Sequence, residues 1–299
     1  MNYFGMFLLT IAMFIWGSSF IALKIAMVDL GPLTVIFFRM LIASMCFLYF
    51  IKDFMKFNFT KKNIQLLLLL AFFEPCLYFI FEAKALQNTT VSQAGMITSL
   101  LPIIAGVAAG YFLKEKITKR LILGSIIALT GAIVLSSQAT ASHSAPNPIL
   151  GNIYEFLAMV CGAGYTIVAR YLTKEFSALF ITAFQVFIGA IFFLPFFIFE
   201  LTHLELNFTF NSVASLFYLG IIVTLGGYGL YNYALTKIEA SKAAVFIYLI
   251  PIFTLILANI ILNEVISFVE ILASAIILLG VFISEFSPSK FKIKKTKSV

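Results

Sequence analysis

Charged residues are scarce in this sequence, because Asp, Glu, Lys and Arg together make up 11% of its 299 residues. Soluble domains contain about 25% charged residues, so the composition excludes an ordinary soluble protein. Hydrophobic residues account for 62% of the chain, and 35 residues are Phe. This balance indicates an integral membrane protein.

Cysteine and histidine are also sparse. Cys46, Cys76 and Cys161 lie inside apolar runs, and their spacing fits neither a disulfide framework nor a metal site. His143 and His203 are isolated in polar stretches. The sequence has no His-Glu-x-x-His, Gly-x-Ser-x-Gly, Cys-x-x-Cys or Walker motif. We therefore predict no catalytic residue, no metal site and no cofactor, which argues against an intramembrane enzyme.

Long apolar runs dominate what is present. A bilayer-spanning helix needs about 20 mainly apolar residues, and the sequence contains ten runs that approach or exceed this length. We predict an all-α fold with ten transmembrane helices. They cover residues 4–26, 32–51, 64–83, 91–113, 121–137, 149–171, 178–199, 212–235, 241–262 and 268–286.

The net charge of +7 is distributed unevenly along the chain. If the N-terminus is cytoplasmic, all but three of the 20 Lys and Arg residues fall in cytoplasmic connections or in the C-terminal tail; the exceptions are Lys24, Lys84 and Arg39. Cytoplasmic loops of membrane proteins are enriched in basic residues. We therefore predict a multi-pass protein of the cell (plasma or inner) membrane with both termini in the cytoplasm. The charge favours contact with anionic lipid headgroups and gives no support for nucleic-acid binding.

The chain repeats itself at a spacing of 149 residues. The residues Ala85, Leu86, Ser92, Ala94, Pro102, Glu115 and Gly131 recur as Ala234, Leu235, Ser241, Ala243, Pro251, Glu264 and Gly280. Because each copy holds five predicted helices, the second copy enters the membrane in the opposite sense. We predict an inverted repeat with a binding site near the midplane. The predicted parts are residues 1–137 (first repeat), 138–148 (an outside linker), 149–286 (second repeat) and 287–299 (a basic cytoplasmic tail).

Several motifs together resemble a known family. The first copy contains Trp16-Gly17-Ser18-Ser19-Phe20, Arg39, Ala85-Leu86, Ser92-Gln93-Ala94, Pro102 and Glu115, and the second contains Ala234-Leu235, Ser241-Lys242-Ala243, Pro251 and Glu264. These segments resemble the EamA domain, and the whole chain is similar to the ten-helix EamA-type members of the drug/metabolite transporter superfamily. The resemblance implies a small-molecule transporter. It also implies a central cavity lined mainly by helices 1, 3, 4, 6, 8 and 9, with helices 5 and 10 at the periphery.

Two carboxylates lie in the third predicted helix, and Glu74 is near its middle. A charge at the bilayer centre costs several kcal/mol, so such groups usually face a cavity or a partner. Tyr78 and Glu82 follow at i+4 and i+8, on the same helical face. The repeat places Val223 and Tyr231 at the positions equivalent to Glu74 and Glu82. The fold does not need these acids in both copies, which favours a functional role.

Two interpretations of Glu74 remain open at the level of the sequence. It could titrate protons or balance the charge of a substrate amine. It could instead be structural, either paired with Arg39, whose guanidinium fork suits a protein or substrate carboxylate, or engaged in a hydrogen bond that locks the third helix. Pro75 removes a backbone hydrogen bond and predicts a local opening of the helix. Glu155, about one turn into the sixth helix, could extend to the outer surface.

The remaining candidates for substrate binding are polar or aromatic residues on three further helices. They are Trp16 and Ser19 on the first helix, Gln93, Met96 and Ser99 on the fourth, and Tyr228, Tyr231 and Asn232 on the eighth. The tyrosines could instead anchor the helix at the membrane interface. Pro102 and Pro251 are candidate hinges because paired helix breaks accompany the binding sites of inverted repeats; fixed kinks are the alternative.

The sequence thus favours a secondary transporter that exports a small metabolite, such as an amino acid, by alternating access, with proton coupling as an open question. The first alternative is an exporter of drugs or lipophilic cations. The second, from a different class, is a membrane scaffold or regulator that transports nothing. The predicted partners are a small-molecule substrate, membrane lipid and, if coupling exists, protons. A monomer and a homodimer both remain open.

Overall fold

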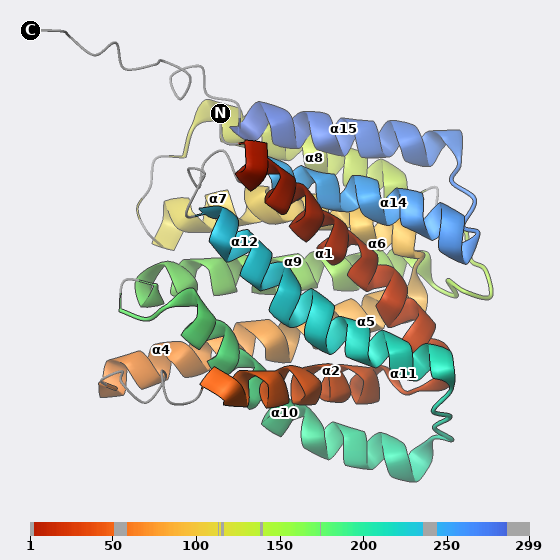
Figure 1. Ribbon diagram of the computed structural model, residues 1–299. Coiled ribbons are helices and arrows are strands. Elements are labelled where there is room, and N and C mark those ends of the chain that lie inside the picture. The colour runs from red at the N-terminus through yellow and green to blue at the C-terminus, as the bar shows by residue number, and fades with distance from the viewer. Residues whose placement is uncertain are drawn as a thin grey trace, which may run out of the picture.

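The computed structural model describes residues 3–50, 59–112, 114, 117–137, 140–173, 175–235 and 244–285. These ranges form a bundle of helices (Figure 1), and apart from an isolated bridge between Ser142 and Ala145 they contain no β-structure. The predicted tail 287–299 lies outside the described residues, as do the motif residues Glu115, Ser241, Lys242 and Ala243.

Seven helices in the described ranges are long and apolar enough to cross a membrane. They are α1 (Tyr3–Asp29), Lys61–Asn88, Val91–Phe112, α8 (Lys119–Ser137), α9 (Pro148–Leu172), α10 (Ala178–His203) and Phe210–Tyr231. Three shorter apolar helices are α2 (Pro32–Phe47), Phe246–Leu262 and Phe268–Ser284. All of these segments fall within or overlap the ranges predicted from the sequence. The protein is therefore an all-helical, multi-pass membrane protein.

Four of these segments consist of two or three consecutive helical elements. The elements are α4 (Lys61–Ala71), η2 (Phe72–Leu77) and α5 (Tyr78–Asn88); α6 (Val91–Ile97), η3 (Thr98–Leu100) and α7 (Leu101–Phe112); α11 (Phe210–Phe217), η4 (Tyr218–Gly227) and α12 (Tyr228–Leu235); and η5 (Ala244–Tyr248) and α14 (Leu249–Leu262). In each of these segments a stretch of π-helix (η2, η4) or 3-10 helix (η3, η5) interrupts or precedes the α-helix. A short turn η1 (Leu48–Phe50) follows α2, and the last described helix is α15 (Phe268–Glu285). Pro102 and Pro251 each lie in the first turn of an α-helix, after η3 and η5, where a missing N–H is tolerated.

The break in η2 confirms the local opening predicted at Pro75. Glu74 has extended backbone angles, φ −145° and ψ 118°, inside an otherwise helical segment. The side-chain amide of Gln185, on α10, donates a hydrogen bond to the Glu74 carbonyl oxygen at 2.8 Å. A buried carbonyl group without a partner is costly, so Gln185 stabilises the opened backbone.

Helices α8 and α15 pack closely at one edge of the bundle (Figure 1) through three glycines. A Cβ atom on Gly280 would lie 2.4 Å from the Ala128 nitrogen, and one on Gly131 would lie 2.8 Å from the Ile277 nitrogen. A Cβ atom on Gly124 would lie 2.4 Å from the Gly280 carbonyl oxygen. Small residues let two helix backbones approach in this way. The order of these contacts shows that the two helices are antiparallel. The shift of 149 residues that relates the two copies turns Gly131 into Gly280 and Ala128 into Ile277, so the contact of Gly280 with Ala128 and that of Gly131 with Ile277 are equivalent.

A second pair of contacts is reciprocal in the same sense. A Cβ atom on Gly17 in α1 would lie 3.0 Å from the Ile250 carbonyl oxygen in α14. A Cβ atom on Gly162 in α9 would lie 3.0 Å from the Leu101 side chain in α7. Gly17 and Gly162 are equivalent in the repeat, as are Leu101 and Ile250, so both copies pack their first helix on the fourth helix of the other copy.

Glu264, between α14 and α15, accepts three hydrogen bonds at the start of α6. They come from the backbone nitrogens of Val91 (2.8 Å) and Ser92 (2.9 Å) and from the Ser92 hydroxyl (2.6 Å). Capping the free N–H groups of a helix contributes about 1–2 kcal/mol, so we expect Glu264→Ala to lower the free energy of unfolding by about this amount. Thermal unfolding in detergent measures it against Glu205→Ala, which changes an exposed acid. Equal melting temperatures for the two variants would contradict this account.

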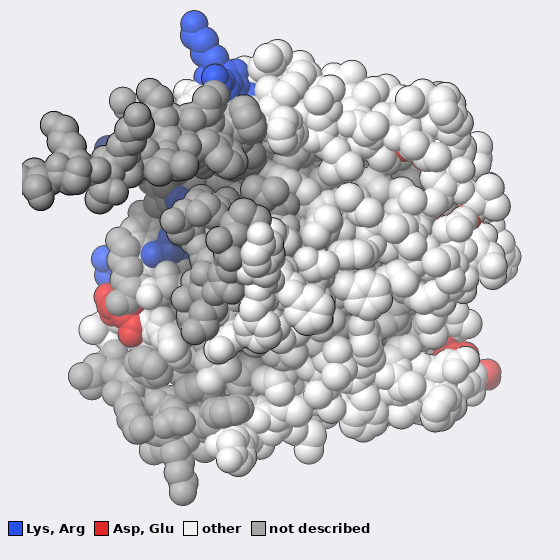
Figure 2. Space-filling model, turned by 45° about the horizontal axis from the view of Figure 1, so that its top comes forward, with Lys and Arg blue, Asp and Glu red and all other residues white. Residues whose placement is uncertain are grey.

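Charge is confined to the two ends of the bundle on the face that Figure 2 shows. Lys and Arg side chains gather at the end where α1 begins, and where described residues form the surface between the two ends, no charged side chain of either sign is seen. A belt without charge is what contact with lipid hydrocarbon requires.

Candidate functional site

A central cavity of about 360 Å³ lies among the helices. Its wall is formed by residues of α1, α2, η2, α5, η3, α7, α9, α10, η4, α12, η5 and α14, together with Thr173. In the described part of the chain, α8 and α15 contribute no residue to this wall. The helices implied by the family resemblance therefore line the cavity, and α2 and α10 line it as well.

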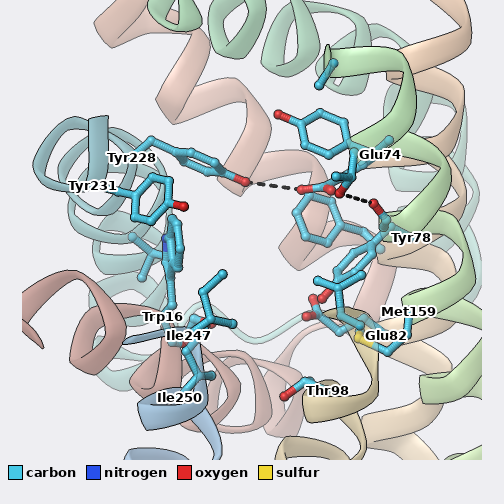
Figure 3. A pocket seen from close by; sticks show the side chains of 18 of the residues that line it. Trp16, Glu74, Tyr78, Glu82, Thr98, Met159, Tyr228, Tyr231, Ile247 and Ile250 are labelled. Carbon is cyan, nitrogen blue, oxygen red and sulfur yellow. Dashed lines mark hydrogen bonds between the residues drawn. The ribbon is translucent and has the colours of Figure 1, made fainter. Parts of the chain in front are cut away.

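One wall of the cavity carries acidic groups (Figure 3). Glu74, Tyr78 and Glu82 come from η2 and α5 and face the aromatic side chains across the cavity. The Tyr228 hydroxyl reaches over from α12 and donates a hydrogen bond to Glu74 Oε1 at 3.2 Å. This hydrogen bond holds the Glu74 carboxyl group in place beside the cavity.

The opposite wall is an aromatic cluster built around Trp16 of α1. The Trp16 ring lies 5.2 Å from Tyr228 at an interplanar angle of 62° and 5.3 Å from Tyr231 at 43°. Gly227 makes room for this arrangement, because a Cβ atom there would lie 2.6 Å from Trp16 Nε1. Edge and tilted ring contacts of this kind add about 0.5–1.5 kcal/mol beyond area burial. The cluster is therefore a preformed aromatic surface opposite the acids.

Arg39 of α2 lines the same cavity and is 7% exposed. Its Nε donates a hydrogen bond to Thr224 Oγ1 at 3.3 Å, and its Cζ lies 4.4 Å from the centre of the Phe79 ring, a cation–π contact. Among the described residues its side chain makes no other hydrogen bond, and no ion pair joins it to Glu74. The structural pair considered from the sequence is therefore not formed in this structure.

Nine of the twelve predicted substrate-binding or coupling residues line the cavity, namely Trp16, Ser19, Arg39, Glu74, Tyr78, Glu82, Ser99, Tyr228 and Tyr231. Gln93 and Met96 do not. The Gln93 side chain is hydrogen-bonded to Asn152 (2.7 Å) and Glu270 (2.9 Å), and Met96 packs in an apolar cluster. On this helix the wall of the cavity begins at Thr98, where the α-helical geometry gives way to η3. A role of Gln93 and Met96 in substrate binding stays a prediction.

Three further predicted residues, Asn232 and the candidate hinges Pro102 and Pro251, are not seen to line the cavity. The side chain of Asn232 lies outside the described residues. Pro102 and Pro251 follow the lining residues Leu101 and Ile250 directly but do not line the cavity themselves. Their role as hinges stays a prediction.

Sequence reasoning missed several lining residues, and the repeat was the signal that could have found them. Positions 149 residues apart line the cavity in pairs: Glu74 with Val223, Phe79 with Tyr228, Glu82 with Tyr231, Thr98 with Ile247, and Leu101 with Ile250. The cavity therefore lies where equivalent surfaces of the two copies meet. Its acids belong to the first copy, since the equivalent positions in the second are Val223 and Tyr231.

Glu155 does not extend to the surface. It is 0% exposed, because α9 runs through the middle of the bundle against α5 and α7. Neither of its carboxylate oxygens has a hydrogen-bond partner in the described part of the protein, and Glu82 Oε2 has none either.

A bundle of apolar helices around a cavity with charged and aromatic walls is the architecture expected of a membrane transporter. The model of the EamA-like transporter family matches residues 3–137 and 149–286. The chain therefore belongs to the EamA-like transporter family, which is part of the drug/metabolite transporter superfamily.

Relatives of known sequence agree with this assignment. The chain is 29% identical to the uncharacterized transporter YetK of Bacillus subtilis (strain 168), over 92% of this chain and 85% of the relative. It is 28% identical to an uncharacterized transporter of Archaeoglobus fulgidus, over 93% of this chain and 96% of the relative. One solved crystal structure aligns with a TM-score of 0.59 at 15% identity, over 95% of this chain and 97% of that chain, which supports the fold.

Proposed function

We propose that the protein is a secondary transporter that exports a small zwitterionic metabolite, such as an amino acid. The carrying observation is that Glu74 and Arg39 line one cavity without forming an ion pair with each other in the described residues. A carboxylate suits a substrate ammonium group, and a guanidinium suits a substrate carboxylate. The cavity volume of about 360 Å³ is within the range of small-molecule sites, about 300–1,000 Å³.

The arrangement of the two copies supports alternating access. The reciprocal contacts of α8 with α15, and of α1 with α14 and α9 with α7, are those of two halves related by a twofold axis. We infer ten spans arranged as two inverted halves that rock about the cavity. One chain then supplies both halves of the site, so a monomer suffices.

The cavity extends toward one end of the helix bundle. Its lining includes Thr173 and Ala178, which flank the connection between α9 and α10. From the distribution of basic residues we infer that this connection and both termini lie in the cytoplasm. The lining residues at this connection support a cavity that opens to the side on which an exporter loads its substrate.

Currents evoked by substrate in liposomes that contain the purified protein test the proposed function. The panel compares neutral amino acids with simple amines, simple carboxylates and lipophilic cations. We expect a saturable response to one or more amino acids and a weaker response to compounds that lack either charge. Equal responses to amino acids and to amines without a carboxylate would contradict the zwitterion proposal.

The aromatic cluster of Trp16, Tyr228 and Tyr231 favours a second candidate, an exporter of lipophilic cations, because ring faces attract cations. Arg39→Gln separates the two candidates. A lost charge-assisted contact costs about 2–3 kcal/mol, so we expect the KM for an amino acid to rise about 30- to 150-fold. Export of a cation would be unchanged or improved by the loss of the positive charge. Arg39→Lys, which keeps the charge, should recover part of the amino-acid transport and controls for folding.

A further inference from the structure

Glu82 of α5 and Glu155 of α9 form a buried carboxyl pair that the substrate site just described does not use. Glu82 is 5% exposed and Glu155 is 0% exposed. Their helices pack against each other, and the rings of the adjacent residues Phe81 and Tyr154 lie 6.3 Å apart. Glu82 Oε2 and both oxygens of Glu155 lack a hydrogen-bond partner within the described ranges. A buried carboxylate without a donor costs several kcal/mol. Two such groups side by side cannot both be charged.

Few other charges face this pair. Tyr78 of α5, Glu74 of η2 and Arg39 of α2 line the same cavity as Glu82. Tyr228 of α12 is engaged by Glu74. The remaining charged groups on the helices packed against α5 and α9 lie near helix ends: Lys24 and Asp29 on α1, Lys61 and Lys62 on α4, Lys84 on α5, Lys119 and Arg120 on α8, and Arg170 on α9. Within the described residues, Arg39 is thus the cation that shares the cavity with the acids.

The two carboxyl groups are suited to bind a proton rather than a metal ion. Calcium needs 6–8 oxygen ligands and magnesium needs near-octahedral coordination. Among the described residues, no group of three or more His, Cys, Asp or Glu side chains is placed to hold a metal ion. A single proton needs two oxygens, one as donor and one as acceptor, and this is what two carboxyl groups provide.

We propose that Glu82 and Glu155 share one exchangeable proton and couple its inward movement to substrate export. This proposal rests on the proposed carrier function. Glu82 lines the cavity, so the proton exchanges with cavity water through it, whereas Glu155 stays buried as its partner. When a cationic substrate group binds in the cavity, the pair gives up its proton to the cavity water and becomes charged.

Because proton binding and substrate binding are linked, the carrier exchanges substrate for a proton. If the substrate lowers the affinity of the pair for a proton, the proton lowers the affinity for the substrate by the same factor. A carrier with this property moves outward with substrate and returns with a proton. The balance is one proton taken up outside and one released inside for each substrate exported, and no covalent bond changes.

Infrared difference spectroscopy of the purified full-length protein without substrate tests the pair independently of transport. Stepping the pH around neutrality should reveal the C=O band of a carboxyl group that gains a proton. Glu74 is a third carboxyl group and lines the cavity, so the band is compared in Glu74→Gln protein. In this background we expect the band to be lost when Glu155→Gln or Glu82→Gln is added, and to persist when Glu205→Gln, an exposed acid, is added. A band that persists in either pair variant of this background would overturn the shared proton.

Transport in liposomes tests the coupling. The measured quantity is the ratio of substrate efflux with an inward proton gradient to efflux at equal pH. We expect this ratio to fall at least tenfold toward unity in Glu155→Gln, and an unchanged ratio would overturn the coupling role. If no substrate is transported by the native protein, the proposed function fails, but the infrared band still reports on the pair, so the two failures are distinguishable.

Discussion

Replacing Glu74 with Gln is expected to weaken substrate binding about 30- to 150-fold, because a charge-assisted contact of about 2–3 kcal/mol with a substrate ammonium group is lost. Gln has the same shape and still offers an oxygen to the Tyr228 hydroxyl, which donates to Glu74 Oε1 at 3.2 Å. The backbone contact from Gln185 to the Glu74 carbonyl group does not depend on the side chain. The variant should therefore fold and lose affinity specifically.

The KM of transport in liposomes measures this loss, with Glu205→Gln as the matched control at an exposed site. The control should keep the native KM. A Glu74→Gln protein with a native KM would assign Glu74 to the structure of the broken helix rather than to the substrate.

A single methyl group at Gly280 is expected to have the largest effect on stability. The Cβ atom of Gly280→Ala would lie 2.4 Å from the Ala128 nitrogen and 2.6 Å from the Gly124 carbonyl oxygen. Both neighbours are backbone atoms, so no side-chain rotation relieves the contact and α15 must move away from α8. Overpacking of this kind costs about 1–3 kcal/mol, and we expect the upper end of that range. The melting temperature in detergent measures it.

Gly229→Ala provides the control for Gly280→Ala. Nothing lies within 4 Å of a Cβ atom at Gly229, and Ala is favoured over Gly in a helix by about 0.5–1 kcal/mol. The control should melt at or above the native temperature, whereas Gly280→Ala should melt well below it. Equal melting temperatures would mean that α8 and α15 are not in close contact in the membrane protein.

The location of the helices could be predicted from the sequence because lipid selects for it directly. Each predicted range is a run of apolar residues, and the helices in the structure overlap all of these runs. The face shared by Glu74, Tyr78 and Glu82 was also predictable, since residues four apart lie on one side of a helix. All three line the cavity.

Predictions failed where local geometry departs from a regular α-helix or where a polar group has a partner from a distant helix. Gln93 was assigned to the cavity because it is polar, but its side chain bonds to Asn152 of α9 and Glu270 of α15. Glu155 was expected near the surface because it lies in the second turn of its helix, but α9 is central and buries it. The periodicity of one segment shows neither which distant residue a polar side chain bonds to nor whether the helix lies at the centre of the bundle.

Counterflow of radiolabelled neutral amino acids tests the central claim most directly. Liposomes with the purified protein are loaded with unlabelled amino acid and diluted into the labelled compound at equal pH. The cavity geometry predicts transient accumulation of label by the native protein and by Glu205→Gln. It predicts strongly reduced accumulation at low substrate concentration by Glu74→Gln and by Arg39→Gln. Accumulation that is equal in all four proteins, or absent from the native protein across the whole panel of neutral amino acids, would contradict a zwitterion carrier.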